Sequence, residues 1–176
     1  MSTDSQAYME IAKRAAAESG NYLRKTFGSM IKVEGKLDRD VKLEVDYNSE
    51  SIITNILSQE TNFSILSEER GKVVISEHKD SSEFLWIVDP LDGSGNYLLG
   101  IPLCCVSIGL WKNGKAFLGV IYDFIRDEYF TGIVNQGAWL NDIPIFTSEV
   151  FKKSNALLTT GSVSYTHLTL PTNREV

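Results

Sequence analysis

Apolar residues in the first part of the chain recur at the spacing of an α-helix. Between residues 4 and 27 they return every third or fourth position, which predicts an amphipathic helix capped by Asp4 or Ser5. Gly20 falls inside this stretch, where a glycine costs about 1 kcal/mol relative to alanine. We expect the apolar face of this helix to pack in the core rather than to bind a partner.

A second helical pattern starts within a group of polar residues and ends near Gln59. Asn48 or Ser49 is the predicted N-cap, because short polar side chains accept hydrogen bonds from the free N–H groups of a first turn. Asp46 is predicted to precede this helix. The positions expected to face the core are Ile52, Ile53, Ile56 and Leu57.

Short apolar runs separated by turn residues dominate the rest of the chain and predict β-strands. A strand is predicted at residues 63–66, and the three runs at 103–111, 116–122 and 128–133 suggest an antiparallel meander. Asn113-Gly114 is a strong signal for a tight hairpin turn within it. The later runs span residues 84–88, 103–111, 116–122, 128–133 and 137–140.

Two carboxylates follow the strand predicted at residues 84–88, which Pro90 and Gly93 are expected to end. Pro90 biases the residue before it toward extended geometry and Gly93 permits a turn, so Asp89 and Asp92 are expected to converge. Close carboxylates repel each other unless a cation or a shared proton neutralises them. Because hard oxygen ligands favour Mg²⁺, Mn²⁺ or Ca²⁺, we predict Mg²⁺ as the cofactor.

The residues after this turn suggest a place for an anion. Ser94, Gly95 and Asn96 are expected to open a helix, whose free N–H groups would attract an anion such as phosphate. The alternative is that Asp-Pro-Leu-Asp-Gly is only a tight turn, since these residue types are common in turns. The spacing fits neither an EF-hand loop nor a P-loop.

Composition narrows the class of protein. The chain has 176 residues, 43% of them hydrophobic, which is enough to close the core of one globular domain. A net charge of -6 without a long basic run argues against nucleic acid or an anionic membrane as the partner. Cys104 and Cys105 are adjacent in an apolar run and are expected to be reduced core residues. Without an apolar span or a targeting segment, we expect a cytoplasmic location.

The motif and its surroundings resemble the inositol monophosphatase family of Mg²⁺-dependent phosphatases, which is related to fructose bisphosphatases and nucleotide bisphosphate phosphatases. The family signature is Asp-Pro-Ile/Leu-Asp-Gly-Thr/Ser after a Trp-containing strand, preceded by a Glu-Glu pair. The matching residues are Trp86, Asp89, Pro90, Leu91, Asp92, Gly93, Ser94 and Asn96, with Ser67, Glu68 and Glu69 upstream. The resemblance implies an α+β fold, the N-terminal portion of a layered α/β/α/β/α sandwich in which a helix pair packs on an antiparallel sheet.

The resemblance also implies roles for individual residues. The ligands of the metal would be Glu68, Asp89, Asp92 and the carbonyl of Leu91. Ser94 and Asp46 would orient the attacking water, and these two with Glu68 form the predicted catalytic set. Gly93, Ser94 and Gly95 would offer backbone N–H groups to the phosphate of the substrate.

The resemblance stops shortly after Gly161. Residues 163–176 read VSYTHLTLPTNREV, and their first part resembles an in-frame translation of the transposon end used in preparing sequencing libraries. We therefore expect a truncated catalytic domain at 1–162 and a non-native tail at 163–176, the alternative being a divergent native tail. The second part of the family's domain, with its further metal-binding acid, would then be missing.

The function implied by the resemblance is Mg²⁺-dependent hydrolysis of a phosphate monoester by a metal-activated water. Inositol monophosphate is the first expected substrate, and the full-length form is expected to be a homodimer. A fructose bisphosphatase, a histidinol-phosphatase or a nucleotide bisphosphate phosphatase of the same family is the nearest alternative. A non-catalytic metal-binding fragment is the alternative from a different class.

Overall fold

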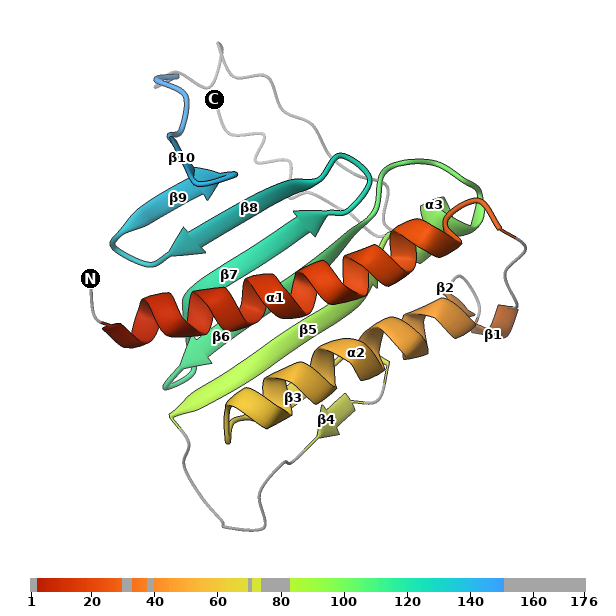
Figure 1. Cartoon of the computed structure of the whole chain (residues 1–176), viewed down its shortest axis with the longest axis horizontal. Helices are drawn as coiled ribbons and strands as arrows, with labels where there is room; N and C mark the ends of the chain where they lie inside the picture. Colours follow the sequence, from red (N-terminus) through yellow and green to blue (C-terminus); the bar gives the residue numbers. More distant parts are fainter. Residues whose placement is uncertain (1–2, 30–32, 38–39, 70, 74–82, 151–176) are drawn as a thin grey trace, which may run out of the picture.

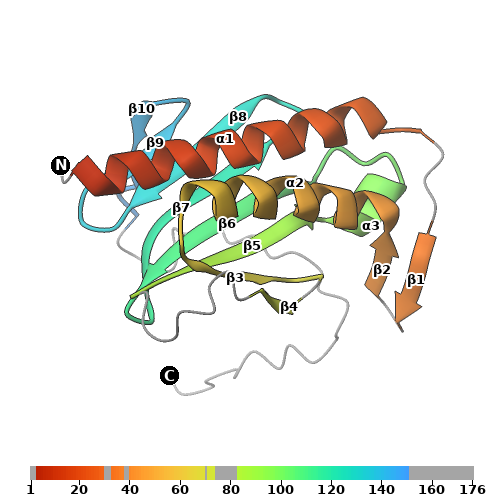
Figure 2. The same cartoon turned by 60° about the horizontal axis from the view of Figure 1, so that its bottom comes forward.

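The computed structural model describes residues 3–29, 33–37, 40–69, 71–73 and 83–150. In this part of the chain, two long helices lie on one face of a single large sheet, and a short hairpin stands apart from it (Figures 1 and 2). The fold is α+β, as predicted. The tail predicted at 163–176 lies outside the described residues.

The two long helices confirm the helical patterns but begin earlier than predicted. Helix α1 is Thr3–Thr26, so Asp4 and Ser5 lie inside its first turn instead of capping it. Helix α2 is Glu44–Glu60, which places Asp46 within the helix and makes the predicted cap at Asn48 or Ser49 wrong. Short polar residues are typical of helix caps, but here Asp46 and Ser49 lie inside the helix and are buried. None of the described helices is both long and apolar enough to cross a bilayer.

The strands follow the predicted order along the chain. Hairpin β1–β2 pairs Val33–Leu37 with Asp40–Leu43 and forms a sheet of its own. The remaining strands are β3 (Ser64–Ser67), β4 (Gly71–Val73), β5 (Phe84–Asp92), β6 (Cys105–Lys112), β7 (Lys115–Asp123), β8 (Glu128–Ile133), β9 (Gly137–Leu140) and β10 (Ile143–Ile145). They form one eight-stranded sheet in the order β10-β9-β8-β7-β6-β5-β3-β4.

The sheet is antiparallel from β5 to β10, and strands β6, β7 and β8 form the predicted meander. The turn between β6 and β7 is formed by Asn113 and Gly114, whose φ values of 51° and 73° are the left-handed values that a tight hairpin needs. The pair β3–β5 is parallel, which the sequence pattern did not predict. Parallel neighbours end at the same edge of a sheet, so β3 and β5 deliver the residues that follow them to one place.

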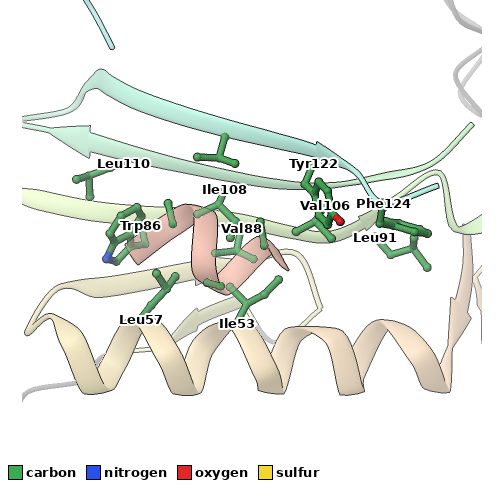
Figure 3. Packing of buried hydrophobic residues seen from close by; sticks show 14 of the residues in the cluster. Ile53, Leu57, Trp86, Val88, Leu91, Val106, Ile108, Leu110, Tyr122 and Phe124 are labelled. Carbon is green, nitrogen blue, oxygen red and sulfur yellow. The ribbon is translucent and has the colours of Figure 1, made fainter. Parts of the chain in front are cut away.

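The core lies between the two helices and the covered face of the sheet. Figure 3 shows Ile53 and Leu57 of α2 pointing toward Trp86 and Val88 of β5, and all four side chains are buried. Alternate positions along β6 are buried, in the period of two that a sheet covered on one face requires. The helices therefore fix β5, the strand that carries the acidic motif.

Gly20 lets helix α1 approach strand β7 closely. A Cβ atom at this position would lie 2.6 Å from Cδ1 of Tyr122 and 2.9 Å from Cβ of Phe124. Both distances are too short for non-bonded carbons, so a larger residue would push the helix away from the sheet. The glycine that weakened the helix prediction is a packing requirement of the fold.

The opposite face of the sheet carries apolar side chains that no described helix covers. Leu66, Trp111, Ile121 and Phe130 come from four different strands, and each is 39–46% exposed. Large contiguous apolar surfaces are uncommon on complete soluble proteins and usually mark a surface that another segment covers.

Candidate metal centre

Strand β5 extends past the predicted residues 84–88 and past Pro90 to Asp92 through a bulge, so that of the two expected stop residues only Gly93 ends it. Asp89 pairs with Ser107 and Asp92 pairs with Cys105, so three steps along β5 oppose two steps along β6. A bulge leaves part of the strand unpaired, and proline is tolerated there because its missing N–H is not needed. The last residue of the strand is Asp92, and Gly93, which has φ of 91°, follows it directly.

The bulge frees two consecutive carbonyl groups, and each finds a hydroxyl donor. Ser49 Oγ on α2 donates to the carbonyl oxygen of Pro90 at 2.7 Å. Ser94 Oγ donates to the carbonyl oxygen of Leu91 at 2.9 Å. The Leu91 N–H donates to Oδ1 of Asp89 at 3.2 Å, which fixes the Asp89 carboxylate beside its own loop.

The parallel pairing of β3 with β5 places Glu68 beside Asp89. Ser67 lies opposite Val88 in the register, and the Glu68 N–H donates to the Val88 carbonyl at 3.2 Å. The two side chains share a hydrogen bond, and burial, Glu68 and Asp92 together raise the pKa of Asp89 from 3.8 to about 8. Excess negative charge is thus concentrated at this end of β3 and β5.

Asp92 lies close enough to Asp89 to raise its pKa but faces a different hollow. Glu68 and Asp89 line a hollow of about 490 Å³ on the uncovered face of the sheet. Asp92 lines the next hollow, of about 320 Å³, together with Asp123 and Arg126. Among the described residues, no three acidic, thiol or imidazole side chains already stand at the spacing of a bound metal. The predicted convergence of Asp89 and Asp92 on one point is therefore incomplete in this structure.

The donor types nevertheless fit a hard divalent cation. Carboxylates and a backbone carbonyl are the oxygen ligands that Mg²⁺ and Ca²⁺ prefer. Burial first, and then the charges of Glu68 and Asp92, raise the pKa of Asp89, and a bound cation would offset these effects. The assignment of Glu68, Asp89, Leu91 and Asp92 as ligands stays a prediction that this arrangement supports.

The predicted catalytic pair Asp46 and Ser94 comes together beside these acids. Asp46 is buried in the first turn of α2, and Ser94 begins the short helix α3 (Ser94–Leu98) directly after Gly93. Ser94 Oγ lies 3.3 Å from Oδ1 of Asp46, so its single hydroxyl proton is shared between this carboxylate and the Leu91 carbonyl. Gly93 precedes α3 in a left-handed conformation, where a Cβ would lie 2.7 Å from the carbonyl oxygen of Leu103. The short helix predicted after the motif is thereby confirmed.

Sequence reasoning missed the role of the polar face of α2. Asp46, Ser49 and Glu50 are buried, and their spacing continues the face formed by Ile53 and Leu57. Polar residues at helical spacing in line with an apolar stripe are a signal that they face the core. That signal indicates that Ser49 faces the core, but not which residue it contacts.

Cys104 and Cys105 are free thiols, as expected, but Cys105 is only partly buried. Its Sγ lies 3.9 Å from Oδ2 of Asp92. Burial and the nearby Asp92 raise the pKa of the Cys105 thiol to about 12, so it remains protonated at neutral pH.

Comparisons of the sequence with protein families and with known proteins agree with each other. The model of a family described as the inositol monophosphatase family matches residues 4–175, including the segment predicted to be a non-native tail, whose origin stays a prediction. An inositol monophosphatase from Mesembryanthemum crystallinum is 39% identical over 154 residues, which cover 87% of this chain and 57% of that protein.

Solved structures agree with the sequence relatives. The extragenic suppressor protein suhB from Bartonella henselae superposes with a TM-score of 0.73 at 37% identity, over 82% of this chain and 55% of that one. A protein described as an inositol monophosphatase and fructose 1,6 bisphosphatase gives a TM-score of 0.70 at 30% identity, over 85% and 56% of the two chains. The chain spans little more than half the length of the relatives that it matches.

Proposed function

Because the chain belongs to the inositol monophosphatase family, we propose that it supplies the metal-binding part of a Mg²⁺-dependent phosphate monoester hydrolase, with inositol monophosphate as the first candidate substrate. The observation that carries this proposal is the hydrogen-bonded pair of Glu68 and Asp89 beside Asp92, where burial first and then the charges of Glu68 and Asp92 raise the pKa of Asp89 to about 8. Carboxylates held together against their own repulsion are what a cation site requires.

In this proposal the ligands are Glu68, Asp89, Asp92 and the carbonyl oxygen of Leu91. Mg²⁺, when bound, supplies a Lewis acid for the phosphate oxygen and lowers the pKa of a coordinated water. Ser94 and Asp46 form the hydrogen-bonded pair that orients the attacking water, with Asp46 fixed by its burial in α2. The water attacks the phosphate in line, and no covalent phosphoenzyme forms.

The phosphate of the substrate lies, in this proposal, against the backbone N–H groups of Gly93, Ser94 and Gly95. Left-handed Gly93 turns the chain so that α3 starts directly at the acidic motif. Backbone N–H groups at such a turn donate to phosphate oxygens without a side chain in the way.

The proposal applies to the whole protein, because this chain spans little more than half of its relatives. A fructose bisphosphatase, a histidinol-phosphatase or a nucleotide bisphosphate phosphatase of the same family is the alternative. One solved relative is described as both an inositol monophosphatase and a fructose 1,6 bisphosphatase, so the substrates of these enzymes are included in the test. A fragment that binds metal without turnover is the second alternative. A homodimer and a cytoplasmic location complete the proposal.

The experiment compares phosphate release from inositol monophosphate, fructose bisphosphate, histidinol phosphate and a nucleotide bisphosphate by the full-length protein, with and without Mg²⁺. Asp92→Asn should lower kcat/KM by more than about a hundredfold, the upper range for disturbing a metal's supporting groups. Glu69→Gln is the matched control, because it removes a charge from the same acidic pair without removing a predicted ligand. An Asp92→Asn variant with full activity would overturn the assignment, and Mg²⁺ binding without turnover would favour the non-catalytic alternative.

A further inference from the structure

A buried chain of hydrogen bonds connects both long helices to the bulge of β5. Ser19 Oγ on α1 lies 2.5 Å from Ser49 Oγ on α2, and Ser49 Oγ lies 2.7 Å from the carbonyl oxygen of Pro90. Both serine side chains are completely buried. The chain therefore runs through the core from α1 to the residue between Asp89 and Leu91.

The direction of the protons in this chain follows from the chemistry of its members. The Pro90 carbonyl can only accept, so Ser49 must donate its single hydroxyl proton to it. Ser49 then has only lone pairs left for Ser19, so Ser19 must be the donor of the other bond. Accepting a hydrogen bond makes a hydroxyl a better donor, so Ser19 strengthens the bond from Ser49 to Pro90.

The hydrogen bond from Ser49 to the Pro90 carbonyl affects the neighbouring residues because Pro90 lies in the bulge of β5. Pro90 and Leu91 have no partners in the register of β5 with β6, so the ladder does not fix the orientation of their peptide groups. Ser49 fixes the Pro90 carbonyl from the core, and Ser94 contacts the Leu91 carbonyl at the site. The Pro90 carbonyl and the Leu91 N–H belong to the same planar peptide group, so rotation of this group would move the Leu91 N–H away from Oδ1 of Asp89.

We infer that Ser49, supported by Ser19, is a positioning residue of the metal centre, which holds the Pro90-Leu91 peptide so that the Leu91 N–H stays directed at the Asp89 carboxylate. This inference rests on the proposed function for the identity of the site. Ser49 touches neither metal nor substrate and acts only through the Pro90 carbonyl. Without it, the loop between the two predicted ligands Asp89 and Asp92 would be free to rotate.

The test uses the 176-residue chain, with Mn²⁺ as the calorimetric probe and exchange of the Leu91 amide proton in the metal-free protein as the second readout. Ser49→Ala should weaken Mn²⁺ binding about tenfold, as losses of supporting groups do, and should speed exchange of the Leu91 amide. Ser19→Ala should have a smaller effect of the same sign, because Ser49 still donates to Pro90. The double variant should bind no more weakly than Ser49→Ala alone.

Thr61→Val is the matched control for the loss of a buried hydroxyl. Thr61 follows α2 and accepts a hydrogen bond from Trp86 Nε1 on β5 at 3.0 Å, far from the bulge. It should lower the melting temperature while Mn²⁺ affinity and Leu91 exchange stay unchanged. If Ser49→Ala does not fold, Ser19→Ala decides the question with the same two readouts.

Unchanged Mn²⁺ affinity and Leu91 exchange in both serine variants would overturn this inference and leave the proposed function intact. Equal weakening by Thr61→Val would also overturn it, because general destabilisation would then account for the effect. A wild-type chain that binds no Mn²⁺ would remove the metal centre and this inference with it.

Discussion

Replacing Asp89 by Asn should stabilise the metal-free chain at neutral and alkaline pH. The folded state raises the pKa of Asp89 from 3.8 to about 8, through burial first and then through Glu68 and Asp92. Between these pH values the folded chain keeps a proton that the unfolded chain has lost, so the stability contributed by this group falls as pH rises. Asparagine carries no charge, keeps an oxygen for the Leu91 N–H and offers an N–H group to Glu68.

The size of the effect has an upper limit set by the pKa. A rise from 3.8 to about 8 would correspond to about 6 kcal/mol if it were expressed in full, at 1.36 kcal/mol per pKa unit. Asp89 is only half-buried, so water screens its interactions with Glu68 and Asp92 and reduces this figure. We expect Asp89→Asn to be more stable than the wild type by about 1–2 kcal/mol at pH 8 and equal to it near pH 4.

Urea unfolding of both proteins across this pH range, without divalent cations, measures the difference directly. Glu18→Gln is the control, because it removes one negative charge from an exposed position on α1. With excess Mg²⁺ the order should reverse, since a ligand that binds only the folded state stabilises it and Asp89→Asn would bind it weakly. A variant that is less stable than the wild type at pH 8 in metal-free buffer would refute the reasoning.

Two further predictions concern the fold. Gly20→Ala should lower the free energy of unfolding by about 1–3 kcal/mol, because its Cβ would lie 2.6 Å from Cδ1 of Tyr122. This loss should exceed the gain from the better helix propensity of alanine. A urea-unfolding curve with a raised midpoint would contradict this prediction. The uncovered face should bind an apolar fluorescent dye, and Ile121→Lys with Phe130→Lys should weaken that binding while leaving the melting temperature nearly unchanged. Equal dye binding by the double variant would place the exposed apolar surface elsewhere.

Local turn chemistry is what made much of the sheet predictable from the sequence. Strands β8 and β9 have the predicted bounds, and Asn113-Gly114 forms the predicted turn, because positive φ values are available to few residue types. The acidic motif could be located for the same reason, since Gly93 must follow the strand at φ of 91°. These features depend on residues close together in the sequence.

The remaining features depend on contacts between distant segments, and no local pattern encodes them. The parallel pairing that places Glu68 beside Asp89 is a choice of strand neighbour, and the bulge that carries β5 past Pro90 is a matter of register with β6. The early start of α2 follows from burial of Asp46 and Ser49 against the motif, which reverses the usual reading of polar residues as caps. The elements of the site were predictable, but the way they meet was not.

The pKa of Asp89 distinguishes between the two interpretations of Asp-Pro-Leu-Asp-Gly, a metal site and a structural turn. If Asp-Pro-Leu-Asp-Gly were only a turn, its aspartates would be there to accept backbone hydrogen bonds, which lower the pKa of a carboxyl group and favour folding when it is ionised. Asp89 does accept one such bond from Leu91, but burial and the repulsion from Glu68 and Asp92 outweigh it and raise the pKa to about 8. An ionised Asp89 therefore opposes folding, and a neutral asparagine would form the same turn without this cost. An aspartate that destabilises the metal-free fold is expected at a position where its carboxylate binds a cation. The arrangement therefore favours the metal centre over the structural turn.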